Sequence, residues 1–84
     1  MYEDNEETTR AEVLYQEALQ LAEELRMKPL QAHCHRDLGL LYSRTGQSEQ
    51  AHAELSMAIR MYRDMEMKLW LPETERRLAK LKQR

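Results

Sequence analysis

The chain has 84 residues, of which 42% are hydrophobic and 33% are charged, and its formal net charge is −2. These values fit one small domain, and no apolar run approaches the roughly 20 residues that span a bilayer, which argues against a membrane protein. The acidic start (Glu3, Asp4, Glu6, Glu7) does not resemble a secretory signal, and a lone cysteine, Cys34, favours a reducing, cytoplasmic location.

The residue usage favours helices along the whole chain. The β-branched residues are limited to one Val, one Ile and four Thr, whereas good helix formers are abundant. We therefore predict an all-α fold of four antiparallel helices in a single domain that spans residues 1–84. The expected helices lie in about residues 6–27, 30–44, 47–65 and 71–82.

The first predicted helix has apolar side chains at three- and four-residue spacing. They are Val13, Leu14, Ala18, Leu21, Ala22 and Leu25. Thr9 and Glu12 resemble a capping box, although the helix can also start earlier. We expect Pro29 to end this helix, because proline disfavours helical geometry at Lys28 and suits the first turn of the next helix.

The remaining predicted helices carry clear end signals. Gly46 follows the second helix, and we expect it in the left-handed conformation just past a helix end. The third helix has an apolar stripe that ends at Tyr62. Pro72 lies in the first turn of the fourth helix, which begins with acids and ends with bases, as the helix dipole favours. Short connections predict antiparallel neighbours.

The sequence resembles itself at an offset of forty residues. The matching pairs include Ala18 with Ala58, Leu25 with Met65, Arg36 with Arg76, Leu38 with Leu78 and Leu41 with Leu81. A fixed period of this length is typical of stacked helical hairpins, each of which cannot bury its apolar face alone.

The middle of the chain resembles a tetratricopeptide repeat (TPR). The matching positions are Leu38, Gly39, Tyr42, Gly46, Ala51 and Ala58, and Leu55 occupies the position of the aromatic residue in the second helix. The chain departs from the family pattern at His35, Leu55 and Arg63, where the family has Trp, Phe and Pro. The resemblance implies a short helical-hairpin solenoid with one full unit between two half-units.

The repeat of forty residues exceeds the thirty-four that is usual for this family. With phrases such as YQEALQLAEEL, the chain resembles the TPR-like tails of large bacterial signalling ATPases and transcription regulators. That resemblance implies a piece of a longer array.

The sequence predicts neither a metal site nor an enzyme. His33 and His35 flank Cys34, but on a helix they point about 200° apart and cannot share one ion. We expect Cys34 to be a small buried residue and His35 to fill the core in the Trp position. No phosphate loop or catalytic arrangement is present, so we expect no cofactor.

The family resemblance implies a concave face that is lined by the first helix of each unit. Its expected residues are His33, Arg36, Leu40, Ser43, Arg76 and Lys80, with Glu73 nearby. The offset of forty would stack Arg36 on Arg76, and with Lys80 they would favour an acidic peptide or a C-terminal carboxylate. The alternative is that these arginines are ordinary surface residues.

A short solenoid also leaves apolar surface at its ends, where a second copy could pack. The residues that we expect to contribute to such a homodimer are Val13, Leu14, Leu21, Trp70, Leu78 and Leu81. Trp70 is either a lid on the last hairpin or an interface anchor. The methionines of the third helix either fill the core or form an adaptable binding surface.

Charge is distributed unevenly along the chain. Residues 1–25 carry eight acids and one base, a net charge of −7, whereas residues 26–84 carry twelve bases and seven acids, a net charge of +5. Three explanations remain open: complementarity to the helix dipoles, head-to-tail attraction between copies, and nucleic-acid contact. The basic residues that would make this last contact are Arg76, Arg77, Lys80, Lys82 and Arg84.

Taken as a whole, the sequence predicts a non-enzymatic module for protein–protein interaction or assembly. The expected partner is a peptide segment, which the charge of the concave face predicts to be acidic, or a second copy of the chain. Nucleic-acid contact through the basic C-terminal helix is the alternative function.

Overall fold

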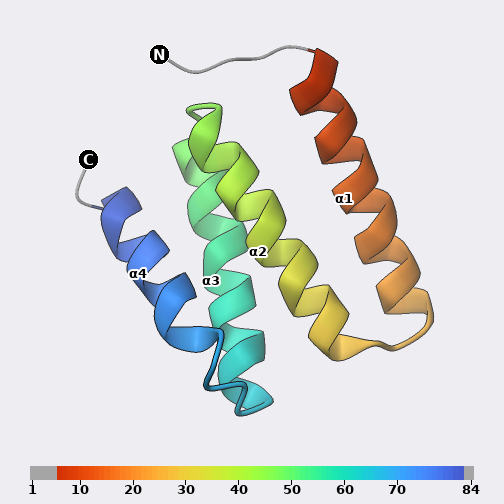
Figure 1. The fold of residues 1–84 in the computed structure, drawn as a ribbon, viewed down its shortest axis with the longest axis vertical. Coiled ribbons are helices and arrows are strands. Elements are labelled where there is room, and N and C mark those ends of the chain that lie inside the picture. The colour runs from red at the N-terminus through yellow and green to blue at the C-terminus, as the bar shows by residue number, and fades with distance from the viewer. Residues whose placement is uncertain (1–5, 83–84) are drawn as a thin grey trace.

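The computed structural model describes residues 6–82 and consists of four α-helices (Figure 1). They are α1 (Glu6–Glu24), α2 (Lys28–Arg44), α3 (Ser48–Asp64) and α4 (Leu71–Lys82). No strand occurs within this range, and the predicted all-α fold is confirmed. None of the described helices is long and apolar enough to cross a membrane.

The helix ends differ from the expected ones by a few residues. α1 ends at Glu24 rather than at Met27, because the three residues after it form a capping turn. α2 begins at Lys28 with Pro29 in its first turn, where the missing N–H of proline has no helical partner to lose. Since α1 already includes Glu6, Thr9 lies inside the helix and does not start it.

The same turn closes three successive helices at intervals of twenty residues. Its central residue has a positive φ each time: 57° at Arg26, 80° at Gly46 and 56° at Glu66. The next backbone N–H then bonds back to a carbonyl five residues earlier: Met27 to Ala22, Gln47 to Tyr42 and Met67 to Tyr62. This is a Schellman cap, which satisfies carbonyls that the helix end leaves free. Helices of 17 residues with three-residue caps account for the forty-residue repeat.

α2 lies at the centre of the molecule, between α1 on one side and α3 and α4 on the other (Figure 1). It packs most closely on α3, and Gly39 makes that possible. A Cβ atom at Gly39 would lie 2.6 Å from Cγ and 2.8 Å from Cδ2 of Leu55, and 3.1 Å from the Leu55 backbone nitrogen. The absence of a side chain at this position therefore sets the separation of the two helices.

Two small clusters of buried residues form the core. Near the α3–α4 turn, Ala32, Ala58 and Tyr62 are buried, and several larger side chains close over them: Met61, Met65, Met67, Trp70 and Leu71. The second cluster joins all four helices through Leu38, Tyr42 and Ala51, against which Tyr15, Leu19 and Leu81 pack. Met61, Met65 and Met67 therefore contribute to the core, whereas Met57 is exposed.

Replacing Arg26 or Glu66 with glycine should stabilise the protein. A residue with a Cβ atom loses about 1–2 kcal/mol in the left-handed conformation, and the greater backbone entropy of glycine in the unfolded chain cancels part of that gain. We expect each substitution to raise the free energy of unfolding by about 0.5–1 kcal/mol in urea denaturation.

The matched control is Gln20→Gly in the exposed middle of α1, which should lower stability by about 1 kcal/mol. A loss of stability in Arg26→Gly and Glu66→Gly as well would show that these caps do not need a positive φ.

Gly39→Ala should destabilise the protein by about 1–3 kcal/mol, although alanine is the better helix former. The added methyl group collides with Leu55. A double-mutant cycle with Leu55→Ala, followed by chemical denaturation, isolates this contact. We expect the two substitutions together to cost clearly less than the sum of their separate effects. Strict additivity would mean that Leu55 is not what excludes a side chain at position 39.

Candidate peptide-binding groove

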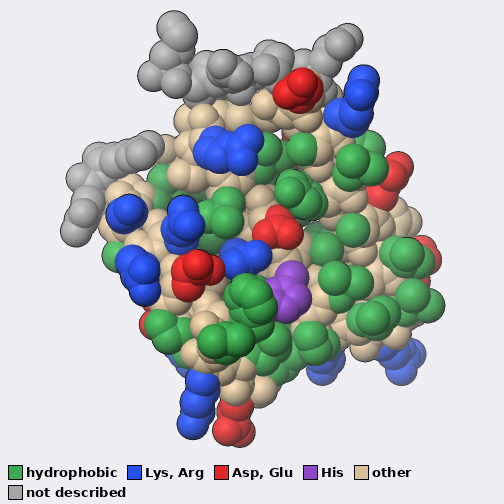
Figure 2. All heavy atoms as spheres, in the orientation of Figure 1, with side chains coloured by type: hydrophobic (Ala, Val, Ile, Leu, Met, Phe, Trp, Pro, Cys, Tyr) green, Lys and Arg blue, Asp and Glu red, His purple; other side chains and the backbone are tan. Residues whose placement is uncertain are grey.

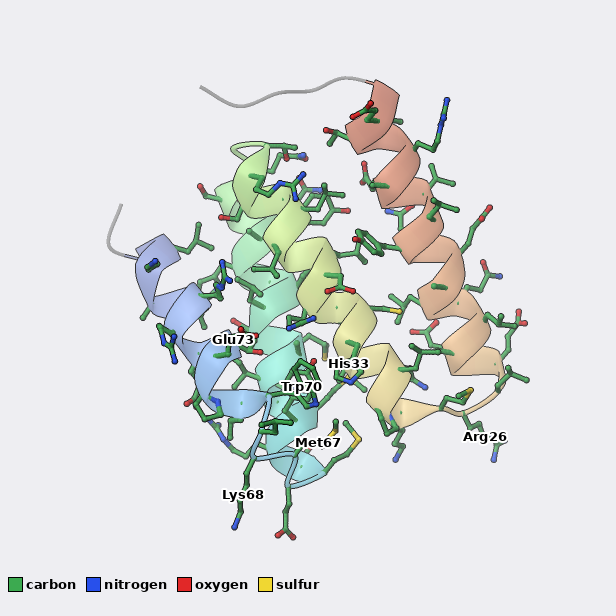
Figure 3. The ribbon with its side chains drawn as sticks, viewed as in Figure 1. Arg26, His33, Met67, Lys68, Trp70 and Glu73 are labelled. Carbon is green, nitrogen blue, oxygen red and sulfur yellow. The ribbon has the colours of Figure 1, made fainter. Side chains whose placement is uncertain are left out.

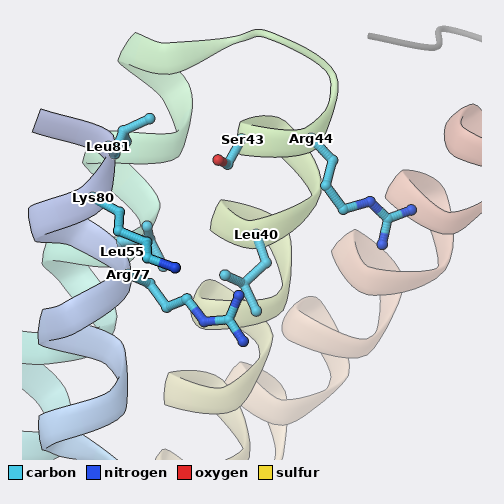
Figure 4. A pocket seen from close by; sticks show the side chains of 7 residues that line it. All are labelled: Leu40, Ser43, Arg44, Leu55, Arg77, Lys80 and Leu81. Carbon is cyan, nitrogen blue, oxygen red and sulfur yellow. The ribbon is translucent and has the colours of Figure 1, made fainter. Parts of the chain in front are cut away.

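A groove of about 390 Å³ separates α2 from α4 (Figure 4). Its lining residues are Leu40, Ser43 and Arg44 from α2, Leu55 from α3, and Arg77, Lys80 and Leu81 from α4. α3 lies behind both neighbours and supplies the floor through Leu55, which is buried. The groove therefore combines an apolar base with a cationic wall on α4.

The two cations of α4 are directed into the groove. Arg77 and Lys80 extend from α4 toward α2, whereas Arg44 points away from α4 at the rim (Figure 4). A spacing of three residues places Arg77 and Lys80 on the same side of the helix. Both are exposed, and neither forms an ion pair with any of the side chains that the structure describes. Their charges are available to a ligand.

Below the groove, four side chains form a compact group that we call the Trp70 cluster: His33, Arg36, Tyr62 and Trp70 (Figure 3). The ring of His33 meets Trp70 edge-on at 4.9 Å between centroids, and its Nδ1 lies 2.7 Å from the Tyr62 hydroxyl. The guanidinium of Arg36 lies 5.1 Å from the centre of the Trp70 ring, within the range of a cation–π interaction.

Arg36 is already paired within the protein. Its Nη1 donates to Glu73 at 3.1 Å and its Nη2 to Asp37 at 3.2 Å. Only 19% of the side chain is exposed, so these two carboxylates balance its charge and leave little of it for an acidic ligand. Arg76, its counterpart at the forty-residue offset, is exposed on α4 and does not line the groove.

The structure thus divides the residues that the sequence assigned to a concave face. Leu40, Ser43 and Lys80 line the groove, whereas His33 and Arg36 belong to the Trp70 cluster. Arg44 and Arg77, which also line the groove, were not predicted from the sequence for that face. The available signal for Arg77 was its spacing of three and four residues from Lys80 and Leu81 along α4.

Burial sets the protonation states in the Trp70 cluster. It lowers the pKa of His33 below 6.5, and the nearby positive charge of Arg36 lowers it further. Burial also raises the pKa of Tyr62 to about 12, so the phenol keeps its proton. The Tyr62 hydroxyl can then donate its hydrogen bond to Nδ1 of the neutral His33 ring.

The residues expected to mediate self-association lie in two different environments. Val13, Leu14 and Leu21 are exposed on α1, whereas Trp70, Leu78 and Leu81 are half-buried within the chain. Trp70 packs over the Ala32–Ala58–Tyr62 core and acts as a lid on the last hairpin. Figure 2 shows hydrophobic side chains gathered over α1 and cationic ones over α4.

The adjacent side chains of α2 have separate structural roles. Cys34 is buried, and burial raises the pKa of its thiol. His35 is half-buried at the α2–α3 interface rather than in the core, with Nδ1 2.6 Å from Oε1 of Glu54. Among the described residues, no group of three or more His, Cys, Asp and Glu side chains could hold a metal ion.

The all-α fold agrees with the comparison with known families. The family model described as "Tetratricopeptide repeat" matches residues 1–64, about three quarters of the chain. The chain belongs to the tetratricopeptide repeat family. Repeats of this family generally mediate protein–protein interactions and are typically non-enzymatic. No curated protein and no solved structure matches the chain.

The residues that match the TPR pattern lie where two helices meet. Leu38, Ala51, Leu55 and Ala58 are buried in the core, and Gly39 contacts Leu55. Tyr42 is also buried, and its hydroxyl donates to Glu12 of α1 at 2.8 Å. Burial and this hydrogen bond raise the Tyr42 pKa to about 12. The residues of the TPR pattern therefore hold α2 against α1 and α3.

The stability of this TPR protein should fall at low pH, in part through His33. Because its folded pKa lies below 6.5, the unfolded chain binds a proton more readily. The neutral ring makes its full contribution to the free energy of unfolding above about pH 6.5, the pKa of histidine in the unfolded chain. This contribution declines as the pH falls from that value toward the lower pKa of the folded state.

Urea denaturation between about pH 7.5 and about pH 5.5 measures this decline. The His33→Gln variant should show a shallower dependence on pH than the parent protein, and the difference between the two isolates His33. Equal slopes would show that protonation of His33 is not opposed by folding.

Proposed function

We propose that the chain binds an acidic segment of another polypeptide in the groove between α2 and α4. The observation that supports this most directly is that Arg77 and Lys80, above an apolar floor, form no ion pair with any described side chain. A segment with alternating carboxylate and aliphatic side chains would satisfy both features. The family membership supports the class of partner, since TPR units generally bind proteins.

The contrast between Arg36 and the groove cations supports the groove as the place where the partner binds. Glu73 and Asp37 already neutralise Arg36, so an incoming carboxylate would have to displace them. Arg77 and Lys80 need no such displacement and gain charge-assisted hydrogen bonds from a carboxylate. Ser43, on the opposite wall, offers a hydroxyl group to the same ligand.

Nucleic-acid contact is supported less well. Arg76, Arg77 and Lys80 form an exposed cationic stretch on α4, which suits a phosphate backbone. Base stacking would need an exposed aromatic ring nearby, and Trp70 instead packs its ring against His33 and Arg36. The apolar floor of the groove also has no role in binding a phosphate backbone.

We further propose that the chain is of the long-repeat TPR type that occurs in tails of bacterial signalling ATPases and regulators. The supporting feature is the twenty-residue interval between capping turns, which lengthens each unit to forty residues. A longer unit gives a longer α2, and with it more length along the groove wall.

The groove proposal is tested with a labelled octapeptide of alternating leucine and glutamate, titrated by fluorescence anisotropy. Reversing the charge in Lys80→Glu or Arg77→Glu should weaken binding at least ten-fold, because each variant loses a charge-assisted hydrogen bond of about 1.5–3 kcal/mol. The matched control is Arg76→Glu, which makes the same charge change on the same helix outside the groove lining.

Equal losses in all three variants would mean that the octapeptide senses only the net charge of α4, and this would contradict the groove. A lysine version of the octapeptide should not bind. If a single-stranded oligonucleotide bound with a steep salt dependence while the octapeptide did not, nucleic-acid contact would replace peptide binding.

A further inference from the structure

α1 exposes an apolar stripe along one side. Leu14, Leu21 and Leu25 are 59%, 53% and 59% exposed. Their spacings of seven and four residues return to the same side of a helix, so the three leucines form one continuous stripe. The forty-residue offset places them in register with Glu54 and Met61 of α3 and with Met65, the residue that follows α3.

Helix α2 packs on these three positions, Glu54, Met61 and Met65. Glu54 contacts His35 of α2 at 2.6 Å. Met61 and Met65 pack against the core cluster to which α2 contributes Ala32. The leucine stripe of α1 therefore occupies the place where a helix of the α2 type packs in the complete unit.

α4 exposes the complementary surface. α2 contacts α3 through small residues: Ala32 joins Ala58 and Tyr62 in the core, and Gly39 lies against Leu55. The forty-residue offset carries these two positions to Pro72 and Ala79 of α4, which are both exposed. The opposite side of α4, which includes Thr74 and Leu78, packs within the chain.

We propose that copies of this chain stack head to tail, with the Pro72–Ala79 side of α4 in one copy packed on the leucine stripe of α1 in the next. The two half-units then make one complete repeat from two chains. The arrangement repeats the α2–α3 pairing already present inside each copy. It uses neither the groove floor nor a peptide ligand, and it therefore goes beyond the proposed function.

Charge complementarity identifies a second copy as the occupant of the stripe. The α2–α3 contacts His35–Glu54 and His33–Tyr62, shifted by forty residues, place α1 residues 14–22 opposite α4 residues 73–75 of the neighbour. Glu17 lies within this α1 segment, and Arg76 follows directly in α4, on the same side as Pro72 and Ala79. Both charged side chains are exposed.

The acids of α4 do not cancel this attraction. Glu73 is bound to Arg36 and Glu75 to Arg63 within the same chain, at 3.1 and 3.0 Å. Among the described exposed side chains of α1, acids outnumber bases, with Arg10 opposed by Glu7, Glu17, Glu23 and Glu24. The docking faces therefore carry opposite charge, and raised salt should weaken the contact.

A head-to-tail contact uses two different surfaces and does not close after two copies. The mean mass should therefore rise continuously with concentration rather than stop at a dimer. Light scattering over a range of concentrations measures this directly. Mass that stays at 10.1 kDa throughout would overturn the proposal.

Matched variants test the stripe. Leu21→Glu places a charge on it, whereas Gln20→Glu adds the same charge to an exposed neighbouring position off the stripe. Leu21→Glu should raise the concentration needed for assembly at least ten-fold more than Gln20→Glu does. Ala79→Trp, on the opposite docking face, should have a similar effect through steric blocking, and circular dichroism verifies that each variant is folded. Equal effects of Leu21→Glu and Gln20→Glu would count against the stripe.

Cross-linking tests the direction of stacking. In a Cys34→Ala background, Leu14→Cys and Glu75→Cys occupy the positions equivalent to the Glu54–His35 contact. A short bismaleimide should cross-link the two variants when they are mixed. It should not cross-link either variant when that variant is present by itself. Efficient coupling of Leu14→Cys to itself would show a symmetric pairing of α1 stripes and would overturn the head-to-tail arrangement.

Discussion

The close approach of α2 and α3 at Gly39 is the contact on which the rest of the structure depends. Leu55 occupies the space that a side chain at position 39 would fill, and it also forms the floor of the groove between α2 and α4. One residue thus sets the depth of the groove and the separation of the central helices. Because protein interiors pack at crystal-like density, a change of one methyl group at this point alters both features.

The Trp70 cluster determines which cations a ligand can reach. Its aromatic rings and two carboxylates hold Arg36 against the body of the protein, where its charge is balanced. No such partners surround Arg77 and Lys80 among the described side chains, and their charges extend into the groove. Arg36 and Arg76, which are related by the repeat offset, consequently have different surroundings, because Arg36 contacts Trp70 and Glu73 whereas Arg76 is exposed.

The same asymmetry explains the exposed surfaces. Each helix in a stacked array has one side for its hairpin partner and another for the adjacent unit. α2 uses both sides, whereas α1 leaves Leu14, Leu21 and Leu25 uncovered and α4 leaves Ala79 uncovered. These exposed surfaces of α1 and α4 are the ones that the proposed stacking brings together. The proposed groove and the proposed stacking surface lie on different sides of α4, so one does not block the other.

The sequence by itself determined the helical fold, the position of Gly46 and the packing role of the repeat residues, because these depend on local periodicity and on glycine geometry. The sequence indicated the cap at Gly46 but not the caps at Arg26 and Glu66. Residues with a Cβ atom rarely adopt a positive φ, so their presence does not predict one. Only the tertiary structure decided that Arg36 is paired, that Trp70 is a lid, and that Arg77 joins Lys80 in the groove. Those outcomes depend on which side chains of different helices come into contact. The periodicity of apolar residues within one helix does not specify such contacts.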